Sequence, residues 1–188
     1  AYVEELLDSA VKMKGMEQEI TKISSIALKD ALTGVKNKAA YEQTKSRLEQ
    51  EIAEGTAKFG ILMIDLNFLK RVNDTFGHDK GDTYIRNLSR ILCDTFAHSP
   101  VYRIGGDEFT VILQDRDLEA CEMLMDSLRE QLEALQDDGQ LEDWKRVSAA
   151  MGLAIYDAGL DASVDDVFRR ADKAMYANKT DMKAVRED

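Results

Sequence analysis

"VYRIGGDEFTVIL", residues 101–113, places a pair of glycines and a pair of acids between two runs of strand-forming residues. Glycine pairs favour the tight turn of a β-hairpin, and "VYRI" and "FTVIL" are typical of its strands. Because Gly105 and Gly106 lack a Cβ, the tip can turn with positive φ and can admit a ligand against bare backbone. The stretch predicts a hairpin, and the adjacent Asp107 and Glu108 either face water or belong to a site.

A second stretch, "KFGILMIDL" (58–66), is a nearly continuous apolar run that ends in an acid. This pattern is typical of a buried central strand. If that strand lies beside the hairpin in one sheet, Asp65, Asp107 and Glu108 converge at one edge of the core. Such a cluster is costly without a cation, and hard oxygen ligands of this kind suit Mg²⁺. Exposure to water is a weaker explanation for Asp65, because this residue directly follows "ILMI".

Hydrophobic periodicity and turn signals place the remaining elements around these strands. The expected helices cover 36–55, 67–76, 80–96, 118–135 and 164 to about 179, and the expected last strand covers 147–156. One face of that strand carries the small residues Ser148, Ala150, Gly152 and Ala154, which lets a helix pack closely. An α/β (α+β) fold follows, in which helices are layered over one face of a mostly antiparallel sheet.

The N-terminal segment, from residue 2 to about 29, has a heptad pattern. Apolar residues recur every seven positions and again three positions later, as in the a/d seam of a coiled coil. These residues are Leu6, Met13, Ile20 and Ala27, with Met16 and Ile23 in the second set. The pattern favours a parallel two-stranded coiled coil. The alternative, a single helix lying on its own domain, needs a wider apolar stripe.

Composition limits the classes of partner. The 188 residues carry a net charge of −11 and are 44% hydrophobic, which suits one domain with a proper core and argues against nucleic acid or an anionic membrane as the partner. An anionic substrate must therefore be held by metal or by a few local cations. Cys93 and Cys121 form no metal or disulfide pattern, which predicts a reducing, cytoplasmic setting.

Because the chain starts inside a helical pattern, we expect it to be the C-terminal part of a longer protein. It shows no apolar run of membrane-spanning length and no signal-peptide core. We expect no membrane contact by this fragment. An upstream sensory domain, and any membrane anchor, would lie outside it.

Residues that follow the central strand, "DLNFLKRVNDTFGHDKGD" (65–82), could hold a nucleotide. Backbone N–H groups of residues 67–70 would begin a helix and offer an anion site, where phosphates could lie while Mg²⁺ binds Asp65. The Asn73 amide and the Asp82 carboxylate could read a base edge, since a carboxylate matches the two N–H donors of guanine. For Asp82 alone, an acid that complements the helix dipole is the alternative.

Two lysines near the end, Lys179 and Lys183, lie four residues apart and would share one face of a continued helix. They could supply phosphate-binding charge in this acidic chain. A solvated surface pair is the alternative.

Five blocks, taken together, resemble the GGDEF family of diguanylate cyclases. They are "RIGGDEF" (103–109), "DALTGVKN" (30–37), "DLNFLKRVNDTFGHDKGD" (65–82), "SAAMGLA" (148–154) and "RADKAMYANK" (170–179), and they follow the order of that family. The resemblance covers about residues 30–183. It implies a signalling helix at 1–29 and a diguanylate cyclase domain at 30–188, with a cyclase/palm-like fold.

The resemblance also implies an activity. Two domains face each other as a homodimer, each holding one GTP, and the 3′-OH of each nucleotide attacks the α-phosphate of the other. The products are cyclic di-GMP and two pyrophosphates. A non-catalytic receptor for GTP or cyclic di-GMP is the alternative, although such receptors usually lose an acid of the signature, and all its acids are present here. A dimerisation module alone would leave the acids unexplained.

Carried over position by position, the resemblance makes Asp65, Asp107 and Glu108 the catalytic acids. Asp65 and Asp107 would bind metal with help from the Leu66 carbonyl, and Glu108 would act as ligand or base beside the reacting hydroxyl. Two Mg²⁺ or Mn²⁺ ions are implied per half-site. The substrate-binding residues that it implies are Asn73 and Asp82 for guanine, Phe68, Leu69, Lys70, Lys179 and Lys183 for phosphate, and Gly105 and Gly106 in the hairpin.

Three positions depart from the family pattern. Asn67 stands where many relatives have Asp, so we do not expect it to bind metal. Met182 and Lys183 replace the usual Gly and Arg; Lys keeps the charge but loses the bidentate fork of Arg. The Arg and Asp of the product-inhibition motif fall here on Phe96 and Ser99, which predicts no feedback inhibition through that site.

Overall fold

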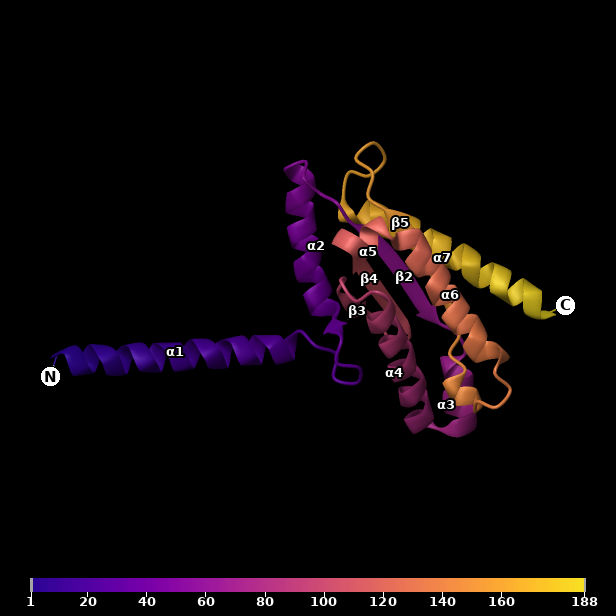
Figure 1. Ribbon diagram of the computed structural model, residues 1–188, viewed down its shortest axis with the longest axis horizontal. Helices are drawn as coiled ribbons and strands as arrows, with labels where there is room; N and C mark the ends of the chain where they lie inside the picture. Colours follow the sequence, from indigo (N-terminus) through magenta and orange to yellow (C-terminus); the bar gives the residue numbers. More distant parts are fainter. Residues whose placement is uncertain (1, 188) are drawn as a thin grey trace.

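The structure is a computed structural model, and it describes residues 2–187 (Figure 1). The helices are α1 (Tyr2–Ala27), α2 (Lys38–Ala53), α3 (Leu69–Phe76), α4 (His78–Thr95), α5 (Asp115–Glu119), α6 (Cys121–Asp137) and α7 (Val164–Glu187), with a 3₁₀ turn at Asp143–Lys145. The strands are β1 (Lys36–Asn37), β2 (Gly60–Leu66), β3 (Val101–Arg103), β4 (Glu108–Leu113) and β5 (Ala149–Ile155).

The strands form one sheet in the order β1-β3-β4-β2-β5. All neighbours are antiparallel except the short pair β1 and β3, which is parallel. The expected hairpin is confirmed as β3 and β4, and the expected central strand is β2, which lies between β4 and β5. The two-residue strand β1 was not predicted, because so short a segment carries no period.

Helices cover both faces of the sheet, which corrects the expectation of one covered face. Helices α2 and α7 pack on the face that carries Ile61 and Met63, whereas α4 and α6 pack on the face that carries Leu62 and Ile64. Every residue of β2 is buried. A strand that is apolar on both sides must be covered on both sides, and the continuous apolar run at residues 58–66 is consistent with this.

The expected close helix packing on β5 is confirmed at Gly152. A Cβ added there would lie 2.1 Å from the backbone nitrogen of Met175 and 2.3 Å from the carbonyl oxygen of Ala171, both in α7. Only glycine leaves room for the helix backbone at this distance. The contact sets the position of α7, which carries Lys179 and Lys183.

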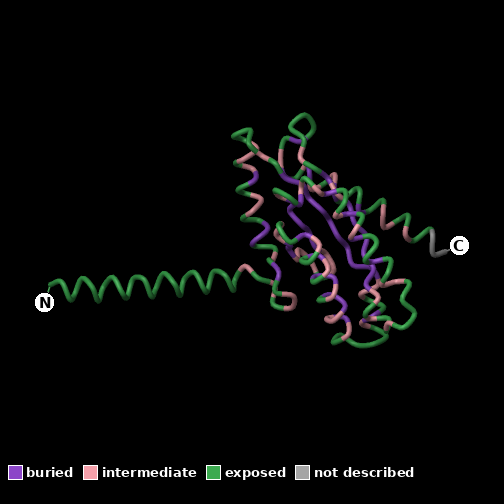
Figure 2. The backbone as a smooth tube through the Cα atoms, in the orientation of Figure 1, coloured by how far each residue is buried: buried purple, intermediate pink, exposed green. Residues whose placement is uncertain are grey.

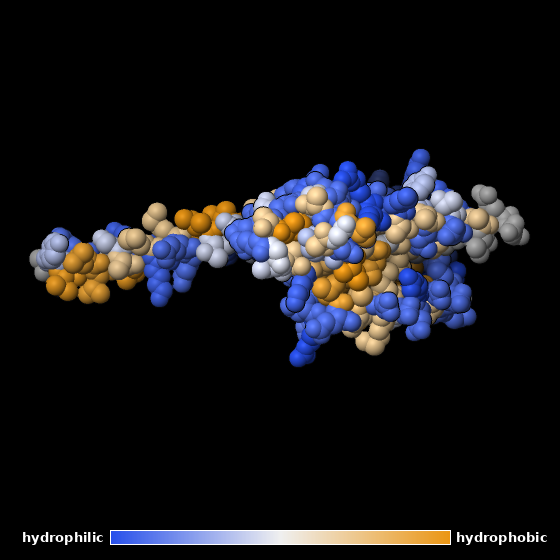
Figure 3. All heavy atoms as spheres, turned by 90° about the horizontal axis from the view of Figure 1, so that it is seen from above, coloured by the Kyte–Doolittle hydropathy of each residue, from blue (hydrophilic) through white to orange (hydrophobic). Residues whose placement is uncertain are grey.

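Helix α1 extends away from the domain, and all its described residues are exposed (Figures 1 and 2). Its seam residues Leu6, Met13 and Ile20 are 55–63% exposed, and apolar side chains lie bare along the helix in Figure 3. The alternative in which α1 lies on its own domain is therefore wrong. The coiled coil stays a prediction. None of the described helices is long and apolar enough to cross a bilayer.

The ends of all five predicted helices differ from expectation, and three of these helices, α3, α4 and α7, carry predicted site residues. Helix α3 begins at Leu69 after Phe68, which has a left-handed backbone (φ 65°), instead of at residue 67. Gly77 (φ 90°) separates α3 from α4, which begins at once at His78 and runs through Gly81. Helix α7 continues past Lys179 to Glu187, because no glycine or proline interrupts residues 180–187.

Candidate active site

The strand register places two of the predicted acids side by side. Asp65 in β2 and Glu108 in β4 are directly paired residues of the antiparallel ladder, so their side chains lie on the same face of the sheet. The next residues are also tied together, since the Leu66 N–H donates to the Asp107 carbonyl at 2.8 Å. Asp65 is 8% exposed, so it does not simply face water.

Negative charge is crowded at this edge. Burial, and then repulsion by Asp107 and Asp65, raise the pKa of Glu108 above its ordinary value, while Lys179 opposes the shift. The Lys179 ammonium lies 2.7 Å from Oδ1 of Asp65. Lys179 therefore offsets part of the negative charge at this edge. The alternative of a solvated surface pair is therefore wrong for Lys179.

The acids fit the chemistry of a magnesium site, although they are not gathered around one point. Asp65, Asp107 and Glu108 offer only oxygen, which is what Mg²⁺ prefers, and their mutual repulsion would fall when a cation binds. No group of three or more His, Cys, Asp or Glu side chains within residues 2–187 is arranged to hold a metal ion. The metal role of these residues and of the Leu66 carbonyl stays a prediction.

The hairpin tip has a different geometry from the one expected. Neither Gly105 nor Gly106 is among the positive-φ residues, so the tip turns without left-handed backbone. Gly105 instead lets the Glu108 side chain lie close, because a Cβ there would lie 2.5 Å from Oε2 of Glu108, whereas a Cβ at Gly106 would meet nothing within 4 Å. Gly105 thus leaves room for the Glu108 carboxylate against bare backbone.

Arg103 fastens this tip to the start of the domain. Its guanidinium donates to the Gly106 carbonyl at 2.7 Å and to both carboxylate oxygens of Asp30 at 3.2 Å. Asp30 also accepts from the N–H and hydroxyl of Thr33. Arg103 and Asp30 both lie within the motifs, but no role was predicted for either, because their contact joins segments far apart in the chain.

A cavity of about 220 Å³ lies beside the acids and gathers the expected phosphate contacts. Its lining residues are Leu66, Asn67, Phe68, Leu69, Lys70, Asp107, Lys179, Met182 and Lys183. The first turn of α3 and two lysines of α7 thus face one space. Backbone N–H groups in the first turn of a helix lack partners within the helix and attract anions. The arrangement can hold a phosphate chain next to the acids.

The two residues expected at the guanine base lie where α3 meets α4. A Cβ added at Gly81 would lie 1.7 Å from Oδ1 of Asn73, so the amide packs directly on the Gly81 backbone, next to Asp82. Both Asn73 and Asp82 are partly buried. Neither lines the 220 Å³ cavity, but α3 connects the two places, since it begins at that cavity and carries Asn73 further along.

The positions that depart from the family pattern have other contacts. The Asn67 side chain donates to the Ser148 hydroxyl at 3.1 Å and to the Met182 sulfur at 3.7 Å. It therefore joins the end of the sheet to α7. Phe96 is 1% exposed in the core, and the Ser99 hydroxyl accepts from the Gln114 N–H. Neither of these two side chains offers charge to a ligand.

The family model and two of the curated relatives that match this chain carry the same description, diguanylate cyclase. A family model described as "Diguanylate cyclase, GGDEF domain" matches residues 27–184. Diguanylate cyclase DgcP of Pseudomonas aeruginosa is 34% identical over 157 residues, which cover 81% of this chain and 22% of that protein. The probable diguanylate cyclase DgcE of Escherichia coli is 30% identical over 166 residues, 85% of this chain and 14% of that protein. The chain therefore spans less than a quarter of either relative.

A solved structure agrees over nearly the whole chain. The crystal structure of the coiled coil and GGDEF domain of DgcB from Caulobacter crescentus, in complex with c-di-GMP, superposes with a TM-score of 0.77 at 26% identity. The match covers 94% of this chain and 93% of that one.

Proposed function

Since the chain belongs to the GGDEF domain family of diguanylate cyclases, we propose that it condenses two GTP molecules into cyclic di-GMP and two pyrophosphates. The observation that carries the proposal is the pairing of Asp65 with Glu108 beside a cavity that Lys179 and Lys183 line. Acids and cations at one sheet edge suit a reaction in which a phosphate chain is bound and broken.

The residues divide the work as follows. Asn73 and Asp82 hold the guanine edge, and the first turn of α3 holds the phosphates together with Lys70, Lys179 and Lys183. Glu108 lies beside the 3′-hydroxyl and accepts its proton. Mg²⁺ or Mn²⁺, two ions per half-site on the acids and the Leu66 carbonyl, would activate the hydroxyl and neutralise the leaving pyrophosphate. Lys179 would give up its ion pair with Asp65 if Asp65 held a metal ion.

One domain supplies half of the reaction, because each GTP attacks the other. The exposed seam of α1 supports a parallel coiled-coil homodimer, which raises the effective concentration of the second domain. We place residues 1–29 as this helix and residues 30–188 as the cyclase domain, the output of a longer cytoplasmic signalling protein with an upstream sensory domain.

A receptor without turnover is the second candidate, and one observation favours it. Asp65 is already neutralised by Lys179 at 2.7 Å, so the ion pair could replace the metal while the cavity still binds phosphate. Both functions use the same residues. They differ in whether GTP is consumed.

The decisive experiment incubates the purified chain with GTP and Mg²⁺ and searches for a cyclic dinucleotide by mass spectrometry. We expect product from the wild type and none from Asp107→Ala with an unchanged circular dichroism spectrum. GTP that stays bound and intact at high protein concentration would support the receptor. Substantial turnover by Asp107→Ala would contradict the metal role of Asp107.

A further inference from the structure

Strand β5 forms one edge of the sheet, and part of its outer side is unpaired. Ser148 accepts from Asn67, and Tyr156 donates to Phe59, so even-numbered residues of this strand exchange hydrogen bonds with β2 and its flanks. In an antiparallel ladder the odd-numbered residues must then direct their N–H and C=O groups away from β2. Leu153, which faces Leu62 in the register, is one of these residues.

Side chains of α7 satisfy this outer edge at two points only. Oδ1 of Asn178 accepts from the Met151 N–H at 2.9 Å, and Arg170 donates to the Ile155 carbonyl at 2.6 Å. Between these caps, the N–H and C=O of Leu153 have no hydrogen-bond partner among residues 2–187. Unpaired backbone groups at a strand edge are a template for a further strand.

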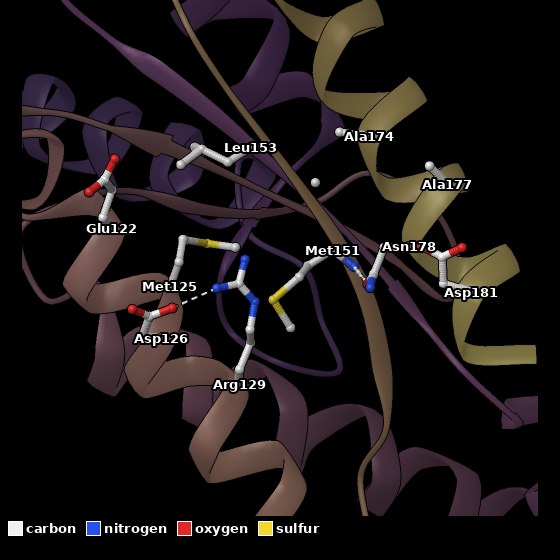
Figure 4. A pocket seen from close by; sticks show the side chains of 11 residues that line it. Glu122, Met125, Asp126, Arg129, Met151, Leu153, Ala174, Ala177, Asn178 and Asp181 are labelled. Atoms are coloured by element: carbon white, nitrogen blue, oxygen red, sulfur yellow. Dashed lines mark hydrogen bonds and ion pairs between the residues drawn. The ribbon is translucent and has the colours of Figure 1, made fainter. Parts of the chain in front are cut away.

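The unpaired segment lies at the bottom of a groove between α6 and α7 (Figure 4). A cavity of about 680 Å³ is lined by β5, by Met125 and Arg129 of α6 and by Ala174 and Ala177 of α7. A second cavity of about 490 Å³ shares Arg129, Met151 and Asn178 with the first and continues the groove. The small alanines leave space at the strand edge, so an extended segment can approach it.

Charge in the groove is mostly negative. The acids that line the two cavities are Glu122, Asp126, Asp181, Glu133 and Asp137. Arg129 is the only cation among the lining residues, and Asp126 pairs with it at 2.6 Å. A ligand that enters this groove must therefore offer positive charge.

We propose that the groove binds an extended, lysine- or arginine-bearing segment of another protein, which adds to β5 as a further strand. Backbone bonds to Leu153 would supply the register, and the acidic rims would select basic side chains. A second copy of this chain is a poorer occupant, because its own net charge is −11. Asn178, which the new strand would displace from Met151, precedes Lys179 of the candidate site, but binding itself needs no turnover.

The test uses two labelled hexapeptides, one of alternating lysine and valine and one of alternating glutamate and valine, with fluorescence anisotropy on the whole chain. We expect the lysine peptide to bind, the glutamate peptide not to bind, and salt to weaken binding. Amide hydrogen exchange at Leu153 should slow when the lysine peptide is present. No binding at millimolar peptide, or unchanged exchange at Leu153, would overturn the proposal.

Two variant pairs separate the backbone contribution from the charge contribution. Leu153→Pro and Leu153→Ala both remove the leucine side chain, but only proline also removes the outward N–H, a loss that edge strands tolerate. Leu153→Pro should weaken binding of the lysine peptide by about tenfold, whereas Leu153→Ala keeps the N–H and should bind the peptide like the wild type. Glu122→Lys should weaken binding of the lysine peptide, whereas Glu51→Lys, which lies outside the groove, should leave that binding unchanged. Equal affinity of Leu153→Pro and Leu153→Ala, with both folded by circular dichroism, would contradict strand addition.

Discussion

Substitution of Gly152 by alanine tests how the fold positions the candidate site. The added Cβ would lie 2.1 Å from the Met175 nitrogen, whereas ordinary contact begins near 3.4 Å. Helix α7 would therefore have to withdraw from β5 by roughly 1.3 Å (3.4 minus 2.1), because the obstructing atoms belong to its backbone and cannot rotate away. Such overpacking costs about 1–3 kcal/mol.

Two measurements should register this displacement. With a urea m-value of about 2 kcal/mol per molar, the unfolding midpoint should fall by roughly 0.5–1.5 M. Because α7 carries Lys179 and Lys183, a shift of about 1 Å should also lower the rate of cyclic di-GMP formation by about 10²-fold.

Gly139→Ala is the matched control, since a Cβ there meets nothing within 4 Å and its φ is not positive. This variant should unfold at or slightly above the wild-type midpoint, because alanine restricts the unfolded chain. If Gly152→Ala matched Gly139→Ala in both midpoint and rate, the close approach of α7 to β5 would not be needed to position the site.

Four further results are expected. Asp82→Ser should weaken discrimination between GTP and ATP in competition binding; an unchanged preference would remove Asp82 from the guanine site. Asp161→Asn should lower the free energy of unfolding at pH 7 by about 1–3 kcal/mol, because its carboxylate accepts from Arg170. Hydrogen bonds from Arg170 hold the pKa of Asp161 below its ordinary 3.8, so the stabilisation is present above pH 3.8 and is lost as the pH falls through the lowered value. The urea midpoints of the wild type and Asp161→Asn should therefore converge at low pH. A constant difference between them down to about pH 2 would contradict the ion pair. Added cyclic di-GMP should not inhibit through the family's inhibition site, and strong inhibition that disappears in Phe96→Ala, with the fold retained, would refute this. Ile20→Asp should lower the dimer fraction in analytical ultracentrifugation without changing the unfolding midpoint of the domain. An unchanged dimer fraction would show that the heptad seam of α1 does not form the dimer.

Local patterns in the sequence were enough where a residue's neighbours in the chain set its environment. The hairpin, the central strand and the helix after it were predicted with small errors at their ends. The errors at helix ends occur where contacts between elements outweigh the propensity of single residues. Gly81 lies within α4 although glycine disfavours a helix interior, and its missing Cβ leaves room for the Asn73 amide. Only one face of the sheet was expected to be covered, because the sequence pattern does not show on which face each helix packs.

The residue types and their spacing were enough to indicate the candidate acids at strand ends, the small face of β5 with Gly152, and the heptad seam of α1. These properties depend on residue type and on the period of helix or strand. Three features emerge only from the folded chain: Lys179 meets Asp65, Arg103 ties the hairpin tip to Asp30, and β5 becomes an edge strand with an unpaired Leu153. The physical reason is that such contacts depend on strand order and register, which result from packing of the whole chain and not from any local pattern.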